Sequence, residues 1–208
     1  MEKITKSRLA ITLSKLKPFE KPSPKLEQYP TESEIAAEVL WFAHMNKDIQ
    51  DKTIADLGCG TGTLGIAALI LGAKKVFFVD IDDKSLKIAK QNLESVDKNL
   101  TKKAEFIKQD IKDFKKNVDL VIQNPPFGIK LKHADRIFLE TAFKSAPVIY
   151  SFHKLETRDF IDDLAAKNSF KITHFWSFDW PLKQTMSYHK KRIQYIKVGC
   201  WRLEKINI

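Results

Sequence analysis

The sequence predicts an α/β protein built on a seven-stranded, mostly parallel sheet, with helices on both faces and an antiparallel hairpin at its C-terminal end. Three observations predict this class. Short apolar segments of strand length alternate with segments of helical periodicity from residue 53 onward. Several apolar segments end directly in a polar side chain, at the edge where an open parallel sheet carries its ligand site. The last two apolar segments, 171–178 and 193–203, have no helix between them and predict the hairpin.

Two helical segments separated by a proline-rich stretch precede the alternating region. Residues 3–16 place apolar side chains near one face of a helix, whereas residues 18–30 contain four prolines and cannot form a regular helix. Thr31 and Glu34 have the spacing of a capping box. We therefore expect the next helix to begin at Thr31.

The alternating region accounts for the rest of the chain. We expect strands at 53–57, 76–79, 104–108, 118–122, 148–152, 171–178 and 193–203, and helices at 63–71, 84–93, 135–145 and 157–167. No internal repeat and no linker divides the sequence. We therefore expect one domain over residues 1–208, with its core in residues 51–208.

The composition excludes several classes of protein. The chain has 208 residues, of which 43% are hydrophobic and 30% charged, as in globular proteins rather than disordered ones. No apolar run reaches the roughly 18 residues that span a bilayer, and no continuous apolar segment follows the basic N-terminal stretch as in a secretory signal. Two cysteines cannot build a disulfide framework or a zinc cluster. We expect reduced thiols, no metal site, no membrane contact and a cytoplasmic protein.

The charge balance indicates a polyanionic partner. The formal net charge is +10, and each phosphate that a basic side chain neutralises releases counterions. Lysines spread over every face would give the same surplus. The stretch 180–208, however, carries seven Lys or Arg against one Glu, and Lys190, Lys191 and Arg192 lie among aromatic residues. Such interleaving suits phosphate pairing together with base stacking, so we expect these three residues to contact nucleic acid.

A glycine-rich loop occupies the ligand position of the predicted sheet. Residues 56–63 read Asp-Leu-Gly-Cys-Gly-Thr-Gly-Thr between a strand and a helix, where glycines allow a ligand to approach the backbone closely. Asp80 lies about 20 residues beyond, as a ribose-binding carboxylate does. The loop alone fits either NAD or S-adenosylmethionine. A second acid, Asp110, at the end of the third strand can accept from an adenine amino group. The Asp-x-Gly-x-Gly form resembles motif I of Rossmann-like methyltransferases. Together these two features favour S-adenosylmethionine. An alternative for either aspartate is to cap the helix that follows it.

Four residues at the end of the fourth predicted strand indicate the chemistry. Asn124, Pro125, Pro126 and Phe127 form the Asn-Pro-Pro-aromatic motif of methyltransferases that act on planar amino groups. Two prolines fix the backbone and remove its N–H donors, so the surface offers mainly acceptors. The Asn124 side-chain oxygen and the Pro125 carbonyl can each take one hydrogen of an exocyclic NH₂, and Phe127 can stack on the base. Orientation then supplies the catalysis, and no dedicated general base is needed.

Several motifs resemble those of the methyltransferase-like-five family, which methylates the N6 amino group of an adenine in small-subunit ribosomal RNA. The resemblance covers about residues 19–198 and is carried by Glu20-Lys21-Pro22, Leu26-Glu27-Gln28-Tyr29-Pro30-Thr31, residues 56–62, Asp80-Ile81-Asp82, residues 124–128 and Ser151-Phe152-His153-Lys154. The Glu-Gln-Tyr-Pro-Thr and Ser-Phe-His-Lys runs are the more specific, because many amino methyltransferases share the glycine loop and the Asn-Pro-Pro-Phe run. The resemblance implies a Rossmann-like class I methyltransferase fold.

The same resemblance implies how cofactor and partners bind. Residues 1–50 would close over S-adenosylmethionine as an N-terminal extension, and residues 124–127 would hold the target base. With the glycine loop included, the expected cofactor-binding set is Gln28, Thr31, Asp56, Gly58, Gly60, Thr61, Gly62, Thr63, Asp80, Asp110, Ile111 and Asn124. Thr61 and Thr63 differ from the residues typical of eukaryotic members. Eukaryotic relatives also work with a small zinc-binding adaptor, for which the strand at 104–108, with Phe106 and Ile107, would offer an edge. The alternative is that this edge is covered within the chain.

Cys59 and His153 each have an alternative role, and the site as a whole has alternative functions. Cys59 lies in the glycine loop without a basic partner, so packing is favoured over a nucleophilic role. His153 ends a strand near the site, where it could contact RNA phosphate or serve as a structural histidine. The alternative functions are methylation of a glutamine amide in a release factor, which is also planar, methylation of adenine in DNA, and RNA binding without catalysis.

Overall fold

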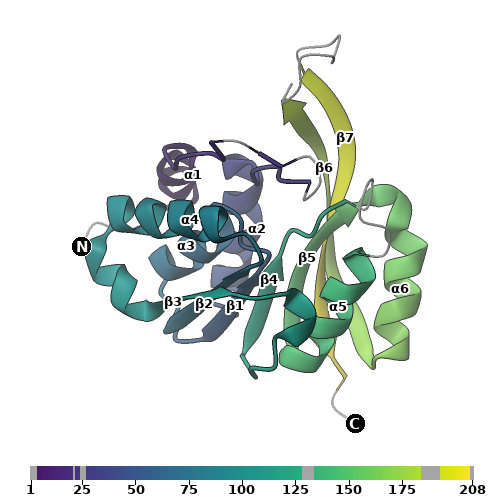
Figure 1. Ribbon diagram of the computed structural model, residues 1–208. Helices are drawn as coiled ribbons and strands as arrows, with labels where there is room; N and C mark the ends of the chain where they lie inside the picture. The colour runs from purple at the N-terminus through teal and green to yellow at the C-terminus, as the bar shows by residue number, and fades with distance from the viewer. Residues whose placement is uncertain (1–3, 21, 24–26, 128–133, 184–192, 207–208) are drawn as a thin grey trace.

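A computed structural model describes residues 4–20, 22–23, 27–127, 134–183 and 193–206 (Figure 1). Its strands are β1 (Thr53–Leu57), β2 (Lys75–Asp80), β3 (Ala104–Lys108), β4 (Leu120–Gln123), β5 (Val148–Lys154), β6 (Phe170–Lys183) and β7 (Ile193–Lys205). They form one sheet in the order β3-β2-β1-β4-β5-β7-β6. The first five strands are parallel, and β7 runs antiparallel between β5 and β6. The predicted fold class is confirmed.

Helices cover both faces of this sheet (Figure 1). One face packs against α1 (Lys6–Ser14), α2 (Ser33–Met45), α3 (Thr63–Ile70) and α4 (Asp83–Val96), and the other against α5 (Ala134–Ser145) and α6 (Arg158–Lys167). Three short 3-10 helices, η1 (Lys98–Lys103), η2 (Ile111–Asp113) and η3 (Leu155–Thr157), connect elements. Successive strand residues alternate between two cores, as Ile54 and Ala55 do. Because both of their faces are buried, β1, β2, β4 and β5 are mostly apolar rather than apolar at every second position.

Several predicted element boundaries differ from the structure, among them the starts of α2 and β4. The helix α2 begins at Ser33 with Glu32 as its N-cap residue, and no side chain makes a capping hydrogen bond there. The Thr31 hydroxyl does not make the predicted capping hydrogen bond and accepts one from Asn124 instead. The strand β4 begins at Leu120, two residues later than the apolar pattern predicts.

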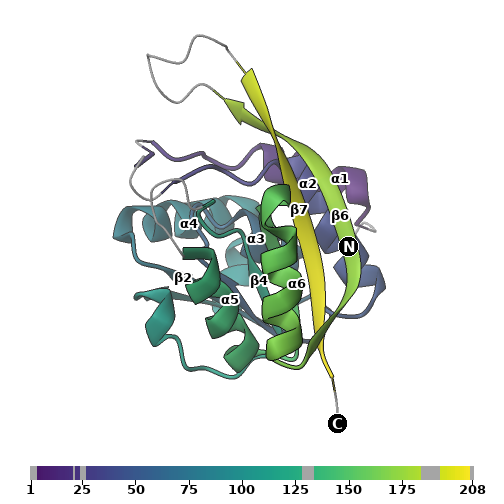
Figure 2. The same cartoon turned by 90° about the vertical axis from the view of Figure 1, so that its right-hand side faces the viewer.

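The predicted C-terminal hairpin is present and is longer than the apolar pattern indicates. Its strand β7 pairs with β5 only as far as the partners Lys154 and Val198. Beyond that point β6 and β7 pair with each other alone among the described strands. We call this two-stranded part, residues 179–183 and 193–197, the hairpin arm; Figure 2 shows it projecting from the rest of the sheet.

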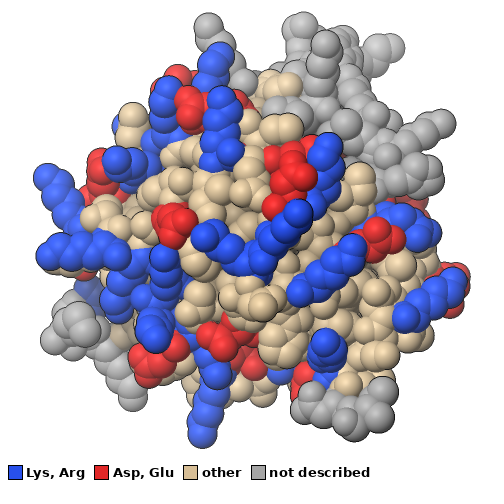
Figure 3. Space-filling view, turned by 60° about the horizontal axis from the view of Figure 1, so that its bottom comes forward, with Lys and Arg blue, Asp and Glu red and all other residues tan. Residues whose placement is uncertain are grey.

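The surface carries many basic side chains. Figure 3 shows Lys and Arg distributed over the face that lies below the sheet in Figure 1, with Asp and Glu between them. On this face the basic side chains are interspersed with acidic ones rather than gathered into one patch. Among the described residues no helix is long and apolar enough to cross a membrane.

A buried ion pair joins the loop after α2 to β7. Arg202 Nε and Nη2 donate to the Asp48 carboxylate at 2.8 and 3.1 Å, and the Tyr150 hydroxyl donates to it at 2.7 Å. The Arg202 and Asp48 side chains are only 6% and 10% exposed. Burial by itself would raise the pKa of Asp48, but the hydrogen bonds from Arg202 and Tyr150 lower it below its ordinary value.

We expect Asp48→Ala to lower the free energy of unfolding by about 3–5 kcal/mol, because the Arg202 guanidinium stays buried without its main partner. Urea unfolding measures this loss. The matched control, Glu38→Ala, removes an ion pair with Lys6 whose side chains are 48% and 45% exposed. That control should cost less than about 1 kcal/mol. Equal losses in the two variants would contradict the account.

Candidate active site

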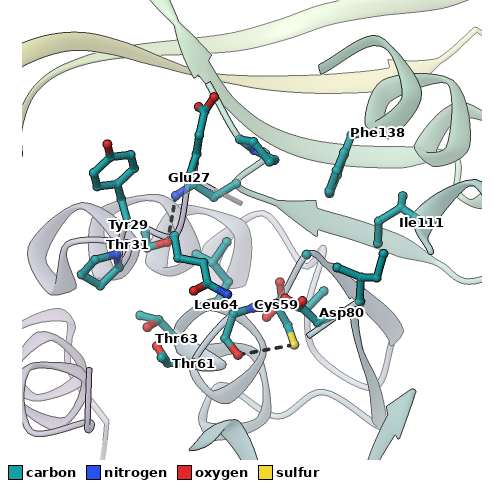
Figure 4. A pocket seen from close by; sticks show the side chains of 18 of the residues that line it. Glu27, Tyr29, Thr31, Cys59, Thr61, Thr63, Leu64, Asp80, Ile111 and Phe138 are labelled. Carbon is teal, nitrogen blue, oxygen red and sulfur yellow. Dashed lines mark hydrogen bonds between the residues drawn. The ribbon is translucent and has the colours of Figure 1, made fainter. Parts of the chain in front are cut away.

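A cavity of about 340 Å³ lies at the carboxyl ends of strands β1 to β4 (Figure 4). Its lining residues are Phe19, Glu27, Gln28, Tyr29, Pro30, Thr31, Asp56, Gly58, Cys59, Gly60, Thr61, Thr63, Leu64, Asp80, Ile81, Asp110, Ile111, Asn124, Pro126, Ile137 and Phe138. In Figure 4, Glu27, Tyr29 and Thr31 lie on one side of the cavity, and Ile111 and Phe138 lie on the other. The structure thus brings together every residue of the predicted cofactor-binding set except Gly62.

The glycine loop is covered closely by two aromatic rings. Gly58 has a φ of +67°, and a Cβ atom there would lie 2.8 Å from Cε1 of Phe138. Gly60 has a φ of +52°, and a Cβ atom there would lie 2.9 Å from Cζ of Phe19. Both the backbone conformation and the close rings therefore require glycine at these two positions.

The other loop residues divide between lining the cavity and packing behind it. Thr61 and Thr63 are buried and line the cavity. Gly62 does not line the cavity, and a Cβ atom there would lie 3.0 Å from the Cβ of Ala89 in α4, so its cofactor contact stays a prediction. Burial raises the pKa of the Cys59 thiol well above its usual range, which favours packing over a nucleophilic role.

Two aspartates at neighbouring strand ends border the cavity in different ways. Asp80 accepts hydrogen bonds from the backbone N–H groups of Gly60 and Asp82, each at 2.9 Å, so it supports the loop rather than capping α4. Burial raises the pKa of Asp80, although both of these hydrogen bonds lower it. Asp110 lines the cavity and also caps η2 by accepting from the N–H of Lys112 at 3.1 Å. Each carboxylate oxygen can accept two hydrogen bonds, so both aspartates retain acceptor capacity toward a ligand.

Asp56 is the most deeply buried acid of the site. Its side chain is 1% exposed, and Oδ2 accepts a hydrogen bond of 2.8 Å from the N–H of Gly65. Burial, together with the negative charge of Asp80, raises the pKa of Asp56 to about 7, although the hydrogen bond from Gly65 lowers it. A cation in the cavity would therefore stabilise the ionised form of Asp56.

Hydrogen bonds hold the segment between α1 and α2 beside the cavity. They are made with Asn92 of α4 and with Asp82, the N-cap residue of that helix. Asn92 Oδ1 accepts from the N–H of Lys17 at 2.8 Å, and Nδ2 donates to the carbonyl of Thr61 in the glycine loop at 3.0 Å. Gln28 Nε2 donates to Asp82 Oδ2 at 3.0 Å. The Gln28 amide thus makes contacts within the protein while its side chain forms part of the cavity wall.

Asn124 lines the cavity and carries a buried oxygen atom without a hydrogen-bond partner among the described residues. Its Nδ2 donates to Thr31 Oγ1 at 3.1 Å. Its Oδ1 is buried and has no hydrogen-bond partner anywhere in the described part of the chain. Pro126 lines the cavity beside it, whereas Pro125 and Phe127 do not. An unsatisfied buried oxygen is costly, so this atom is suited to accept a hydrogen bond from a bound molecule.

The predicted RNA contacts have different outcomes. Lys190, Lys191 and Arg192 lie outside the described residues. His153 is 2% exposed, its Nε2 is hydrogen-bonded to Ser151 Oγ, and burial lowers its pKa to about 3. A neutral, enclosed imidazole does not fit the predicted phosphate contact, and the structural alternative holds for His153.

Among the residues of the site region that were missed in the sequence are Phe19, Phe138 and Asn92. Phe19 and Phe138 lie over the glycine loop, but an apolar side chain in a loop or helix looks the same as an ordinary core residue. Asn92 did carry a signal, because it is a polar residue at a helical position that the apolar pattern assigns to the buried face. It is 1% exposed, and such buried amides need partners.

Comparisons with known proteins identify the family. Residues 32–149 match the Methyltransferase small domain family. The protein MJ0284 of Methanocaldococcus jannaschii is 39% identical, over 98% of this chain and 95% of its own length. The rRNA N(6)-adenosine-methyltransferase METTL5 of Danio rerio is 37% identical, over 86% of this chain and 89% of its own length. The crystal structure of PH1948 from Pyrococcus horikoshii has a TM-score of 0.89 at 40% identity, covering 97% of this chain and 98% of that one. The chain therefore belongs to the METTL5-like family of methyltransferases, and its cofactor is S-adenosylmethionine.

Proposed function

We propose that this protein transfers a methyl group from S-adenosylmethionine to the N6 amino group of an adenine in ribosomal RNA of the small subunit. One observation carries the proposal. The Asn124 side chain holds a buried oxygen acceptor without a partner among the described residues, at the carboxyl end of β4 and beside the cavity. An exocyclic NH₂ group supplies the hydrogen that this oxygen lacks.

The residues of the cavity fit the cofactor. Asp80 and Asp110 offer carboxylate oxygens for ribose hydroxyls and an adenine amino group, and Ile111 and Phe138 offer apolar surface for a flat ring. When bound, S-adenosylmethionine supplies a methyl group on a positively charged sulfur, so the methyl group is already activated for attack by an amine. Residues 1–50 then act as an N-terminal extension that closes over the cofactor, as the family resemblance implies.

The protein's own part in the reaction is to orient the accepting amine. Asn124 Oδ1 and the Pro125 carbonyl each accept one hydrogen of the NH₂ group, which turns the nitrogen lone pair out of conjugation. Thr31 holds the amide so that the oxygen faces the ligand. Phe127 stacks on the base. These contacts position the reacting atoms and need no general base, because the proton can leave after transfer.

The choice of an RNA adenine is supported by relatives and by charge. Relatives from Danio rerio, Drosophila melanogaster and Caenorhabditis elegans, at 37%, 33% and 32% identity, are rRNA N(6)-adenosine-methyltransferases. The net charge of +10 suits a polyanionic substrate. A paired adenine would have to leave its helix at a cost of about a few kcal/mol, so we expect an unpaired adenine in structured RNA.

We also propose that a small zinc-binding adaptor protein pairs with the edge strand β3. The strand lies at one edge of the sheet, and no described strand pairs with its outer side. Phe106 of β3 stacks on Phe78 with ring centroids 4.8 Å apart, so the edge rests on an ordered core. Hydrogen exchange tests this: bound adaptor should slow exchange of the β3 amides, and unchanged β3 exchange in a formed complex would refute it.

The direct test of the function is methylation of ribosomal RNA taken from cells that lack the protein. The purified protein is incubated with this RNA and S-adenosylmethionine carrying a deuterated methyl group, and the nucleosides are analysed by mass spectrometry. We expect labelled N6-methyladenosine in small-subunit RNA. Label in other nucleosides only, or in a glutamine-containing protein added in parallel, would refute the proposal, provided that the adaptor is also supplied in one arm.

The affinity for the cofactor should rise with pH, because the pKa of Asp56 is raised from 3.8 to about 7. The folded protein holds the Asp56 proton more tightly than the unfolded chain does, so without ligand its free energy of unfolding falls as the pH rises through this window. A nearby cation lowers a carboxyl pKa by about 1–3, so we expect affinity to increase roughly tenfold or more between pH 5.5 and 8.

Isothermal titration calorimetry across this pH range measures the effect. Asp56→Asn is the control, since an amide cannot ionise and should flatten the pH dependence. Wild-type affinity that stays constant over the range, or a dependence that survives in Asp56→Asn, would contradict the role given to Asp56.

A further inference from the structure

The hairpin arm packs, through Trp180, against Phe127 in the segment that follows β4. Two-stranded hairpins are marginal in water without packing on one face, and beyond Val198 the arm has no third described strand beside it. Trp180, paired with Ile196, lies in this two-stranded part and is nevertheless only 1% exposed. Something outside the arm must therefore cover the Trp180 ring.

Two aromatic rings provide this cover. The Phe152 ring of β5 lies with its centroid 5.8 Å from that of Trp180, at an interplanar angle of 66°. The Phe127 ring lies 6.1 Å away at 90°, which is an edge-to-face contact. Trp180 thus joins the arm to the last residue of the Asn-Pro-Pro-Phe run.

The contact fixes the plane of the Phe127 ring. The two prolines before it restrict the backbone. Rotation about χ2 of a phenylalanine is broad, so the backbone leaves the ring plane open. A perpendicular neighbour selects one plane, because aromatic pairs prefer edge-to-face packing. The plane of Phe127 is what a stacked base would meet.

We propose that Trp180 is a positioning residue for the methyl-accepting base: it sets the Phe127 ring plane from the arm side without touching the substrate. This inference rests on the proposed function, in which Phe127 stacks on the base. It assigns to β6, far along the chain from the Asn-Pro-Pro-Phe run, a share in aligning the amine. Packing between the hairpin arm and residues 124–127 then helps to align the amine.

A merely structural tryptophan would behave differently on substitution. Its loss would lower stability, and any activity loss would follow from that lower stability. A positioning tryptophan instead affects the turnover rate at saturating RNA and cofactor, while both binding affinities persist. Phe152 offers a matched control, because it is also 1% exposed and its ring packs against Trp180. Among the described residues its ring does not pair with that of Phe127.

The experiment compares Trp180→Phe, Trp180→Leu and Phe152→Leu in the full chain, using the RNA that the wild-type protein methylates. Urea unfolding, cofactor calorimetry, RNA binding and kcat are measured for each. We expect kcat to fall severalfold in Trp180→Phe and roughly 10- to 100-fold in Trp180→Leu, with both dissociation constants within about twofold of wild type. Phe152→Leu should lose stability but keep kcat within about threefold.

Each outcome bears on the inference. Equal kcat losses in the Trp180 and Phe152 variants would overturn it, as would a Trp180→Leu protein whose cofactor affinity falls together with kcat. If Trp180→Leu fails to fold, Trp180→Phe decides, and a wild-type kcat there would overturn the inference. A wild-type protein that methylates no RNA adenine would instead refute the proposed function, so the two failures are distinguishable.

Discussion

Replacing Asn124 with alanine is expected to lower kcat by about 10²–10³-fold, because the variant loses the buried oxygen that holds the accepting amine in the transition state. Affinity for RNA should change little, since phosphate contacts dominate it. Single-turnover methylation with labelled cofactor measures the first effect, and RNA titration measures the second. The combination separates an enzyme from an RNA-binding module, which has no turnover to lose.

Thr31→Val is the matched control for the Asn124 variant. It removes the hydroxyl that accepts from Asn124 Nδ2 at 3.1 Å but leaves the Oδ1 acceptor in place. We expect a smaller loss of about tenfold in kcat, because the amide can then turn out of its productive orientation. An Asn124→Ala protein that methylates RNA at the wild-type rate would show that the amide does not hold the amine.

Asp80→Ala should weaken cofactor binding by roughly 100-fold, because hydrogen bonds to a charged group contribute about 1.5–3 kcal/mol each. The substitution has a second effect, since Asp80 also accepts from the N–H groups of Gly60 and Asp82 and so shapes the glycine loop. Calorimetry with S-adenosylhomocysteine, which cannot react, measures the affinity.

Asp80→Asn separates the two effects of the alanine variant. The amide keeps an acceptor oxygen for the loop but carries no negative charge, so its affinity should lie between those of wild type and Asp80→Ala. Affinity within twofold of wild type in Asp80→Ala would exclude Asp80 from the cofactor site.

The fold was predictable because burial on both faces leaves a strong local signal. Each parallel strand appears as a short apolar run, and the polar residue that ends it marks the ligand edge. Boundaries that depend on distant contacts were not predictable. Thr31 has the local spacing of a cap, but Asn124, 93 residues away in sequence, uses its hydroxyl. A capping box is read from four residues and cannot reveal a competing partner at that distance.

The polar and glycine residues of the candidate site were predictable, because its chemistry requires those residue types. The aromatic residues that only shape the cavity were not predictable. Carboxylates and glycines at strand ends are rare enough to be noticed. The rings of Phe19 and Phe138 close over the glycine loop, but their sequence positions resemble those of any core residue. For His153 the sequence suggested a contact that the structure does not favour. Its position at a strand end suggested a phosphate contact, but its side chain is buried and hydrogen-bonded to Ser151 Oγ.

The most direct test of the account is a crystal structure of the protein with S-adenosylhomocysteine and an RNA that contains the target adenine. We predict an extruded adenine whose N6 atom lies about 3 Å from Asn124 Oδ1, with Phe127 against the face of its ring. An adenine bound elsewhere, or an Asn124 amide that presents its nitrogen to the base, would contradict the claim that this oxygen aligns the amine.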